Sequence, residues 1–350
     1  MITSMHLRKL CCLIVFVLLT SGVRAQGTTY QAAIFGFYNI ENLFDTIDDP
    51  KTDDAEFLPA GINTWTSAKY TLKLERISEV ISKIGNEVAP GGPVVLGLSE
   101  IENRGVIEDL INTPTLKPLN YGVVHFNSPD RRGVDVAFIY QKSRFVVEGS
   151  HPFRLYTEDT SFRTRDQILM WGKLDGETIY FLVNHWPSRR GGEARSAPKR
   201  KAAAALSRHI ADSLYAMNPN VKFILMGDLN DDPTNASITK TLMAKGKVSE
   251  MVAGDLYNPM YKLYQDGIGS YAYRDSWDLY DQIIVNSNVA KGDSASYFLM
   301  QAKVFNAQFL KQKTGTFAGY PWRTAAGGQY LAGYSDHFPV YGILMRKRTK

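Results

Sequence analysis

The sequence predicts an α/β protein, a four-layer sandwich in which two mixed, mostly antiparallel β-sheets pack face to face and are flanked by helices. Three features of the 350 residues indicate this class: short apolar runs are numerous, few stretches have helical periodicity, and a tight-turn pair, Asp175-Gly176, joins two neighbouring runs. Many strands with few intervening helices argue against a regular alternation of strand and helix. They favour two packed sheets that are covered by helices.

The expected strands are apolar or alternating runs separated by polar or glycine-containing segments. Two of the runs, 167–174 and 178–183, are joined through Asp175-Gly176, which is typical of a two-residue hairpin turn. This hairpin indicates antiparallel pairing in the strand-rich centre of the chain. The runs lie at residues 32–38, 94–98, 121–126, 134–140, 167–174, 178–183, 221–226, 279–285 and 338–344.

Helices are expected in three places. Residues 67–84 have apolar side chains spaced so that they fall on one helical face, and Gly85 with the following Pro-Gly-Gly-Pro segment ends the pattern. A short helix is expected at 105–112. A long one is expected at 193–217, with four consecutive alanines in its middle.

The first 25 residues have the pattern of a secretory signal peptide. Arg8 and Lys9 precede an unbroken apolar run at 10–19, and residues 23–25 (VRA) give the small-x-small pattern of a cleavage site. The alternative, an uncleaved membrane anchor, is disfavoured because the run is short for a bilayer. We therefore expect a signal peptide at 1–25 and one domain at 26–350, with no later segment that is long and apolar enough to span a membrane.

Charge and cysteine content restrict the function classes. Both cysteines, Cys11 and Cys12, lie in the signal segment, so the mature chain has neither a disulfide nor a cysteine nucleophile. An exported protein of this kind is expected in the bacterial periplasm or the external medium. Removing the three basic residues of the signal from the 40 in the chain leaves 37 against 35 acidic ones, a nearly neutral balance that does not itself identify a partner.

Eight polar residues lie at or near the ends of expected strands, where a rigid scaffold can direct them into a common cleft. Glu100 and Asp336 offer carboxylates that suit a hard cation such as Mg²⁺ or Mn²⁺. Asp228 can orient or deprotonate a water molecule, and a histidine can stabilise developing charge. The set is Asn39, Glu100, His185, Asp228, Asn230, Asp281, Asp336 and His337.

Six segments that contain these residues occur in a recognisable order. They are 37–44 (FYNIENLF), 97–103 (GLSEIEN), 132–137 (RGVDVA), 184–188 (NHWPS), 227–230 (GDLN) and 335–340 (SDHFPV). Together they resemble the endonuclease/exonuclease/phosphatase family, which includes DNase I-like nucleases, abasic-site endonucleases, sphingomyelinases and inositol-polyphosphate phosphatases. The resemblance spans roughly residues 32–346 and implies a metal-dependent hydrolase of phosphate esters.

The resemblance also implies roles for single residues. Glu100 is expected to be the principal metal ligand, with Asn39 beside it and Asp336 as a second carboxylate on the metal side. Asp228 is expected to activate the attacking water, and Asn230 to hold the phosphate.

Two histidines are expected to act on the phosphate itself. His185 resembles the histidine that faces the scissile phosphate, and His337 the second catalytic histidine. Asp281 takes the place of the aspartate that orients His337, although residues 279–283 (LYDQI) lack the basic residue that usually precedes it.

Each of these residues taken alone also has a purely structural interpretation: a turn residue, a helix-terminal charge, a buried histidine or a local hydrogen-bonded pair. The joint occurrence of all the segments in order favours function. An acidic loop at 45–56 is interpreted as a solvated surface loop rather than a Ca²⁺ site, because its spacing does not match an EF-hand.

The sequence leaves the substrate open between two classes. A basic segment directly after His185 could grip a polyanion, which favours a nuclease acting on DNA or RNA. The near-neutral overall charge favours the alternative, a phosphodiesterase or phosphatase acting on a lipid headgroup or a small phosphorylated molecule.

The cofactor is expected to be a divalent cation, Mg²⁺ first with Mn²⁺ or Ca²⁺ as alternatives. The protein is expected to be a monomer, and the basic segment to be its contact with a nucleic-acid substrate. The basic residues are Arg189, Arg190, Arg195, Lys199 and Arg200.

Overall fold

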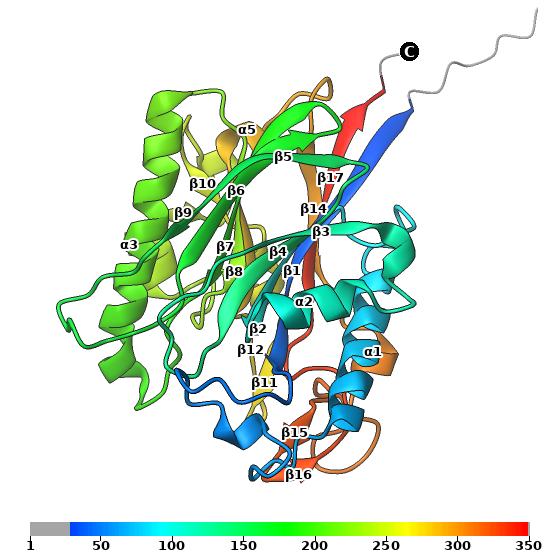
Figure 1. Ribbon diagram of the computed structural model, residues 1–350. Coiled ribbons are helices and arrows are strands. Elements are labelled where there is room, and N and C mark those ends of the chain that lie inside the picture. The colour runs from blue at the N-terminus through cyan, green and yellow to red at the C-terminus, as the bar shows by residue number, and fades with distance from the viewer. Residues whose placement is uncertain (1–28, 349–350) are drawn as a thin grey trace, which may run out of the picture.

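The computed structural model describes residues 29–348, which form four layers (Figure 1). Within this range two large sheets, of six and seven strands, lie face to face, and two small two-stranded sheets lie at one end. Helices cover the outer faces of both large sheets. The predicted fold class is therefore confirmed. The predicted signal peptide at 1–25 lies outside the described residues.

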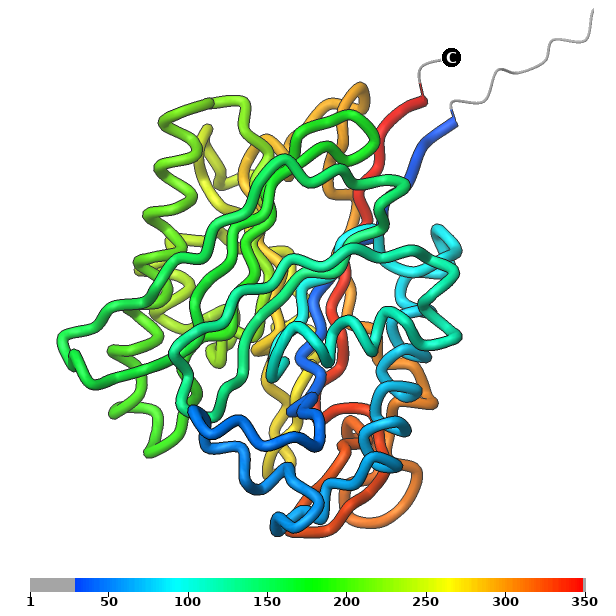
Figure 2. Tube along the Cα trace, in the orientation of Figure 1, coloured from blue at the N-terminus to red at the C-terminus, as the bar shows by residue number. Residues whose placement is uncertain are grey.

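The first sheet has the strand order β14-β17-β1-β2-β4-β3. Only β1 and β2 are parallel, and the other neighbours are antiparallel. Because β1 pairs antiparallel with β17 from its first residue, the two ends of the described chain lie side by side (Figure 2). The strands are β1 (Tyr30–Leu43), β2 (Val95–Ile101), β3 (Tyr121–His125), β4 (Asp135–Gln141), β14 (Phe298–Val304) and β17 (Val340–Lys347).

The second sheet has the order β5-β6-β7-β8-β13-β10-β9, with β7–β8 and β9–β10 as its parallel pairs. The β6–β7 hairpin turns at Asp175 and Gly176, whose φ angles of 47° and 90° give the left-handed turn that an Asp-Gly pair favours. The strands are β5 (Phe145–Phe153), β6 (Gln167–Leu174), β7 (Glu177–His185), β8 (Phe223–Asp228), β9 (Ala244–Lys245), β10 (Leu256–Tyr257) and β13 (Asp281–Asn286).

Helices α1 (Ser67–Lys83) and α2 (Arg104–Ile111) pack on the outer face of the first sheet, and α3 (Glu193–Met217) packs on the outer face of the second (Figure 1). Side chains cap two of them: Thr66 accepts from the backbone N–H of Lys69, and Asn103 from that of Val106. No helix among residues 29–348 is long and apolar enough to cross a membrane.

Shorter elements complete the chain. The small sheets pair β11 (Tyr271–Tyr273) with β12 (Ser276–Asp278) and β15 (Ala325–Ala326) with β16 (Gln329–Tyr330). Short α-helices are α4 (Met260–Gln265) and α5 (Ser287–Ala290). The remaining turns are 3₁₀ segments at Ala55–Phe57, Lys117–Leu119, Val248–Glu250 and Gln308–Leu310, and a π-helical turn at Ser237–Thr241.

The apolar side chains divide into three cores that match the layers. One lies between the two sheets and includes Phe35, Phe138 and Phe181. The second lies between the first sheet and α1 and α2, and the third between the second sheet and α3. Burial of apolar surface on both faces of each sheet fixes the sheets relative to each other, so their edges form a rigid frame for a site.

This frame explains where the polar residues meet. The parallel pairs β1–β2 and β7–β8 lie in the middle of the two sheets. In each pair the carboxyl ends of both strands lie at the same end of the sheet. His185 and Asp228 occupy matched positions at the ends of β7 and β8, and Asp281 faces Asp228 from the start of antiparallel β13. Side chains from two sheets therefore converge at one end of the sandwich.

Candidate active site

A cleft of about 1270 Å³ opens at this end of the sandwich. The structure brings all eight predicted site residues to it. Asn39 and Asp281 lie just behind its wall, where each is hydrogen-bonded to a residue that lines it. The lining includes Glu100, His185, Asp228, Asn230, Asp336 and His337.

Asp228 is buried at the centre of the polar set. Its Oδ2 accepts a hydrogen bond from Nδ2 of Asn39 at 3.1 Å, and its Oδ1 accepts from the backbone N–H of Asn230 at 2.9 Å. The Nε2 atoms of His185 and His337 lie 3.6 and 3.9 Å from the same Oδ2. Burial raises the pKa of Asp228 to about 6, so the carboxylate is close to the basicity that a general base needs at neutral pH.

Asp281 holds His337 in a fixed orientation. Its Oδ2 accepts from Nδ1 of His337 at 2.6 Å and from the hydroxyl of Ser270 at 2.5 Å. Burial alone lowers the pKa of His337, but the carboxylates of Asp281, Asp336 and Asp228 outweigh it and hold this pKa well above its ordinary value. His337 is therefore an imidazolium at neutral pH, and its Nε2 points toward Asp228.

His185 differs from His337 in its charge. Its side chain is buried, and burial, followed by the positive charges of Arg165 and Arg132, lowers its pKa well below the ordinary value. His185 is therefore neutral at pH 7 and can donate or accept a hydrogen bond, but it does not supply a positive charge.

Glu100 and Asp336 provide two further carboxylates in the lining of the cleft. Glu100 interrupts the β2–β4 register, and its φ of 63° turns the side chain out of the sheet, where Oε2 accepts from the backbone N–H of Asn42 at 3.0 Å. An arginine partly balances each carboxylate: Arg132 lies 3.9 Å from Glu100, and Arg323 lies 3.3 Å from Asp336.

The donor chemistry at the cleft fits a hard divalent cation. Glu100 and Asp336 supply carboxylate oxygens, and the Oδ1 atom of Asn39, which accepts one bond from the backbone N–H of Glu41, keeps a second lone pair. A second candidate metal site is the cluster of Asp228, Asp281 and His337, whose ligand atoms all lie within 4.8 Å of one another. In that cluster a cation competes with the proton that His337 carries.

Two arginines near the reacting groups were missed at the sequence level. Arg165 is buried, pairs with Asp130 at 3.1 Å and donates to the carbonyl oxygen of Trp186 at 2.8 Å. Arg132 lies in segment 132–137, one of the six that resemble the family, but no role was predicted for it. The position of Arg132 inside that segment could have indicated a functional role. No sequence pattern indicates one for Arg165, because its partner Asp130 is 35 residues away.

The basic segment after His185 divides into two groups, which corrects part of the prediction. Arg200 is fully buried and forms ion pairs with Asp231 and Glu193, so it is not available to a substrate. Arg189 lines the cleft but is bound to the carbonyl oxygen of Asn230 at 2.9 Å and to Asp231 at 3.2 Å. Of this segment, only Arg190, Arg195 and Lys199 line the cleft without an ion pair inside the described range 29–348.

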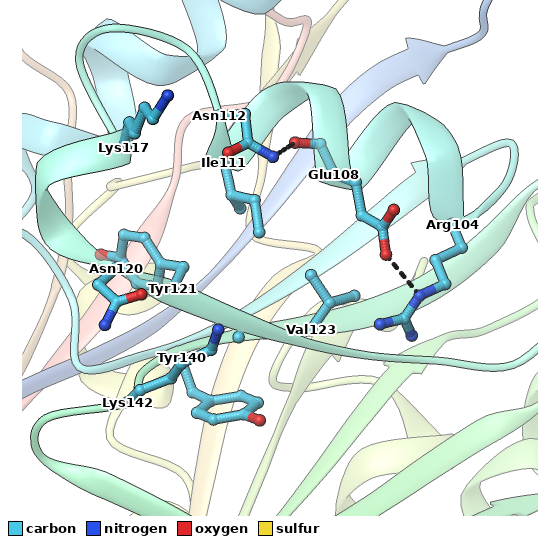
Figure 3. A pocket seen from close by; sticks show the side chains of 11 residues that line it. Arg104, Glu108, Ile111, Asn112, Lys117, Asn120, Tyr121, Val123, Tyr140 and Lys142 are labelled. Carbon is cyan, nitrogen blue, oxygen red and sulfur yellow. Dashed lines mark hydrogen bonds and ion pairs between the residues drawn. The ribbon is translucent and has the colours of Figure 1, made fainter.

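A second cavity, of about 630 Å³, lies between α2 and the edge strand β3 (Figure 3). Lys117 and Lys142 lie on its rim, and the guanidinium of Arg104 is paired with Glu108 at 2.7 Å. None of the eight predicted site residues lines it. The chemistry of the chain therefore belongs to the larger cleft.

The fold and the cleft define the class of protein: a phosphoesterase built on two packed sheets. The family model described as the endonuclease/exonuclease/phosphatase family matches residues 34–347. The chain belongs to this family, and the resemblance predicted from the sequence is confirmed. A search of curated proteins finds no match.

Solved structures with the same fold come from animals and bacteria. TDP2 of Danio rerio in complex with a single-strand DNA product is 14% identical, with a TM-score of 0.54 over 90% of this chain and 99% of that one. A mannosyl-6-phosphatase of Bacteroides thetaiotaomicron is 17% identical, with a TM-score of 0.53 over 89% and 99%. An endonuclease/exonuclease/phosphatase family protein from the same bacterium is 17% identical, with a TM-score of 0.52 over 91% and 97%. At these identities the likeness shows the fold alone.

The charge states of Asp228 and His337 predict a bell-shaped dependence of kcat/KM on pH. Activity should rise as pH increases through about 6, where Asp228 ionises, and should fall only at a pH well above the ordinary histidine pKa, where His337 loses its proton. Asp281→Asn should move the alkaline limb to lower pH, because it removes the largest charge that raises the pKa of His337. Asp278→Asn, on the cleft wall, is the control. An alkaline limb that stays in place in Asp281→Asn would disprove this assignment.

Proposed function

We propose that the protein is an exported, divalent-cation-dependent phosphodiesterase that cleaves nucleic acid. The observation that carries the proposal is the position of the reacting groups. Asp228 and the two histidines are buried in a cleft whose lining also includes basic side chains that form no ion pair within residues 29–348.

Each of the three reacting groups has a separate role in hydrolysis. Asp228, oriented by Asn39, accepts a proton from the attacking water at Oδ2. The imidazolium of His337, fixed by Asp281, stabilises negative charge on the phosphoryl oxygens or protonates the leaving oxygen through Nε2. His185, as a neutral imidazole, donates a hydrogen bond to the phosphate.

Glu100 and Asp336, with Asn39 beside them, would hold the cation. When bound, it supplies Lewis-acid stabilisation of the phosphoryl oxygens. The amide of Asn230 donates one N–H to the carbonyl oxygen of Trp186 at 3.0 Å, so its second N–H is left to donate to the phosphate.

The choice of nucleic acid rests on the rim. Arg190, Arg195 and Lys199 lie along one side of the cleft, and Arg131, Arg163 and Arg274 add positive charge around it. Tyr273 is half exposed on the same cleft and offers an aromatic face on which a base can stack. A chain with several phosphates can engage such a rim, whereas a single phosphate cannot.

The second candidate is a phosphatase or phosphodiesterase that acts on a small phosphorylated molecule or a lipid headgroup. Asp159 and Asp278 lie on the same cleft and reduce its positive charge, and the mature chain is nearly neutral. One of the similar structures is a mannosyl-6-phosphatase. In this case the rim would contribute little to binding.

Charge reversal on the rim distinguishes the two substrates. In the triple variant Arg190→Glu, Arg195→Glu and Lys199→Glu, nucleic-acid binding should weaken. The slope of log K against log salt should fall by about 2 to 3, since each phosphate contact contributes about 0.7 to 0.9. Hydrolysis of bis-p-nitrophenyl phosphate, which has no distal phosphates, should be nearly unchanged. Lys201→Glu is the matched control, because Lys201 is exposed on the same helix but does not line the cleft. A salt slope that is flat in the unmodified protein would favour the small substrate.

Export is part of the proposal. Expression of residues 1–350 in a bacterium should give a mature protein that starts at Gln26 and is found outside the cytoplasm, as the signal pattern at 1–25 predicts. Intact-mass spectrometry of the fractionated cells measures this. An uncleaved chain in the cytoplasmic fraction would contradict it.

A further inference from the structure

Arg200 lies in α3 with its side chain fully buried, although arginine is among the residues most rarely buried without a partner. Its NH1 donates to the hydroxyl of Ser196 at 2.8 Å, and its NH2 donates to Oε1 of Glu193 at 2.8 Å. Its Nε lies 2.7 Å from Oδ1 of Asp231. The guanidinium is thus placed between the first turns of α3 and the residue that follows Asn230.

Asp231 is the other half of this contact and is also buried. Its Oδ1 is shared between Arg200 and Arg189, at 2.7 and 3.2 Å, and its Oδ2 accepts from the hydroxyl of Ser237 at 2.5 Å. The carboxylate therefore has partners on both oxygens. Its position is determined by α3, by the segment before α3 and by the π-helical turn at Ser237–Thr241.

The backbone of Asp231 is continuous with the turn that carries the reacting groups. Asn230 has a φ of 49°, a left-handed conformation that must be held in place, and its backbone N–H donates to Oδ1 of Asp228. Arg189 donates to the carbonyl oxygen of Asn230 at 2.9 Å. A movement of Asp231 would therefore change the orientation of both Asp228 and Asn230.

The same turn also fixes the start of β13, where Asp281 lies. The carbonyl oxygen of Asp231 accepts from Nε2 of Gln282 at 2.6 Å, and Oδ1 of the next residue, Asp232, accepts from the backbone N–H of Leu279 at 2.8 Å. These contacts join the Asp228 turn to the strand that orients His337. The Arg200–Asp231 ion pair therefore supports both the turn that carries Asp228 and the strand that carries Asp281.

We propose that Arg200 and Asp231 are positioning residues for phosphoester hydrolysis, a buried ion pair that holds the turn of Asp228 and Asn230 in its working geometry. This proposal rests on the proposed hydrolase function, because the ion pair can affect turnover only if the chain hydrolyses a phosphate ester. It assigns part of the basic segment to support of the catalytic turn rather than to substrate binding. Neither residue lines the cleft, so their loss should act on turnover rather than on substrate affinity.

The test compares Arg200→Met and Asp231→Asn with Arg208→Met, all in the 26–350 chain. Arg208 lies on the same helix and pairs with Asp212 at 2.6 Å in a partly exposed contact, so it is a matched control. With bis-p-nitrophenyl phosphate, kcat should fall about 10- to 100-fold in the first two variants, because small displacements of reacting groups are costly. KM should change by less than about twofold, and Arg208→Met should resemble the unmodified protein.

The double variant Arg200→Met/Asp231→Asn tests whether the two residues act as one unit. Its kcat should be no lower than that of either single variant, because each substitution already breaks the same pair. Arg200→Lys, which keeps the charge, should recover part of the activity even if Arg200→Met folds poorly.

Hydrogen exchange provides a readout that does not depend on activity. Peptides covering 227–235 should exchange faster in Arg200→Met and Asp231→Asn than in the unmodified chain, and those covering α1 should not change. Folded variants with normal turnover would overturn the proposal and leave the hydrolase function intact. If the unmodified chain hydrolyses no phosphate ester, the proposed function fails, and unchanged exchange at 227–235 would then overturn the positioning role separately.

Discussion

Asp228→Asn is expected to lower kcat by about 10²- to 10⁴-fold, the usual contribution of a general base. The carboxylate lies between both histidines, and its raised pKa of about 6 suits it to accept a proton from water near neutral pH. The amide of Asn occupies the same space but cannot take up that proton. Steady-state hydrolysis of bis-p-nitrophenyl phosphate at saturating Mg²⁺ measures the loss.

Asp232→Asn is the matched control for Asp228. Asp232 lies four residues further along the chain, is buried, and also has a pKa raised to about 6 by burial, but it does not line the cleft. Its substitution should reduce kcat far less, because Asn keeps the Oδ1 atom that accepts from the backbone N–H of Leu279. Equal losses in the two variants would mean that the Asp228 effect comes from the packing of the turn and not from proton transfer.

Glu100→Gln is expected to abolish metal-dependent activity while the fold stays intact. Loss of a carboxylate ligand should cost about 10³-fold or more in kcat/KM at low Mg²⁺, because a bound cation contributes several kcal/mol of transition-state stabilisation. Part of the activity should return at high Mg²⁺, since Gln keeps an oxygen ligand. The measurement is the Mg²⁺ dependence of kcat/KM, with circular dichroism as the check on folding.

Glu102→Gln serves as the control for Glu100. Glu102 lies two residues away and accepts from the backbone N–H of Asp45 at 2.7 Å, and it does not line the cleft. Near-normal turnover and an unchanged Mg²⁺ dependence in Glu100→Gln would remove Glu100 from the metal site.

The central elements of the fold could be predicted because their local and tertiary preferences agree. The helix expected at 193–217 coincides with α3, and the one expected at 67–84 ends one residue before the prediction. The edge strands β5 and β14 were missed. Each contains a register irregularity, and β5 also contains Gly149 and Pro152, so neither presents the uninterrupted apolar run that marks a central strand.

The reacting groups could be predicted because they lie in short segments at the ends of buried strands, and such ends meet at one edge of a sandwich. The supporting residues could not. Arg165 and Arg200 act through ion pairs with Asp130 and Asp231, each about 30 or more residues distant, and nothing local marks such a pair. A run of basic residues likewise does not say which of them face inward, because the buried face of α3 is decided by its packing against the second sheet, which is a tertiary contact.

The Mg²⁺ dependence of bis-p-nitrophenyl phosphate hydrolysis by the 26–350 chain tests the central claim most directly. Reactions with Mg²⁺, with EDTA and with Mg²⁺ restored after EDTA should be run beside His185→Ala. We predict turnover that requires the cation, returns when it is restored and falls sharply in His185→Ala. Turnover that persists in EDTA, or that His185→Ala leaves unchanged, would contradict a metal-assisted phosphoesterase at this cleft.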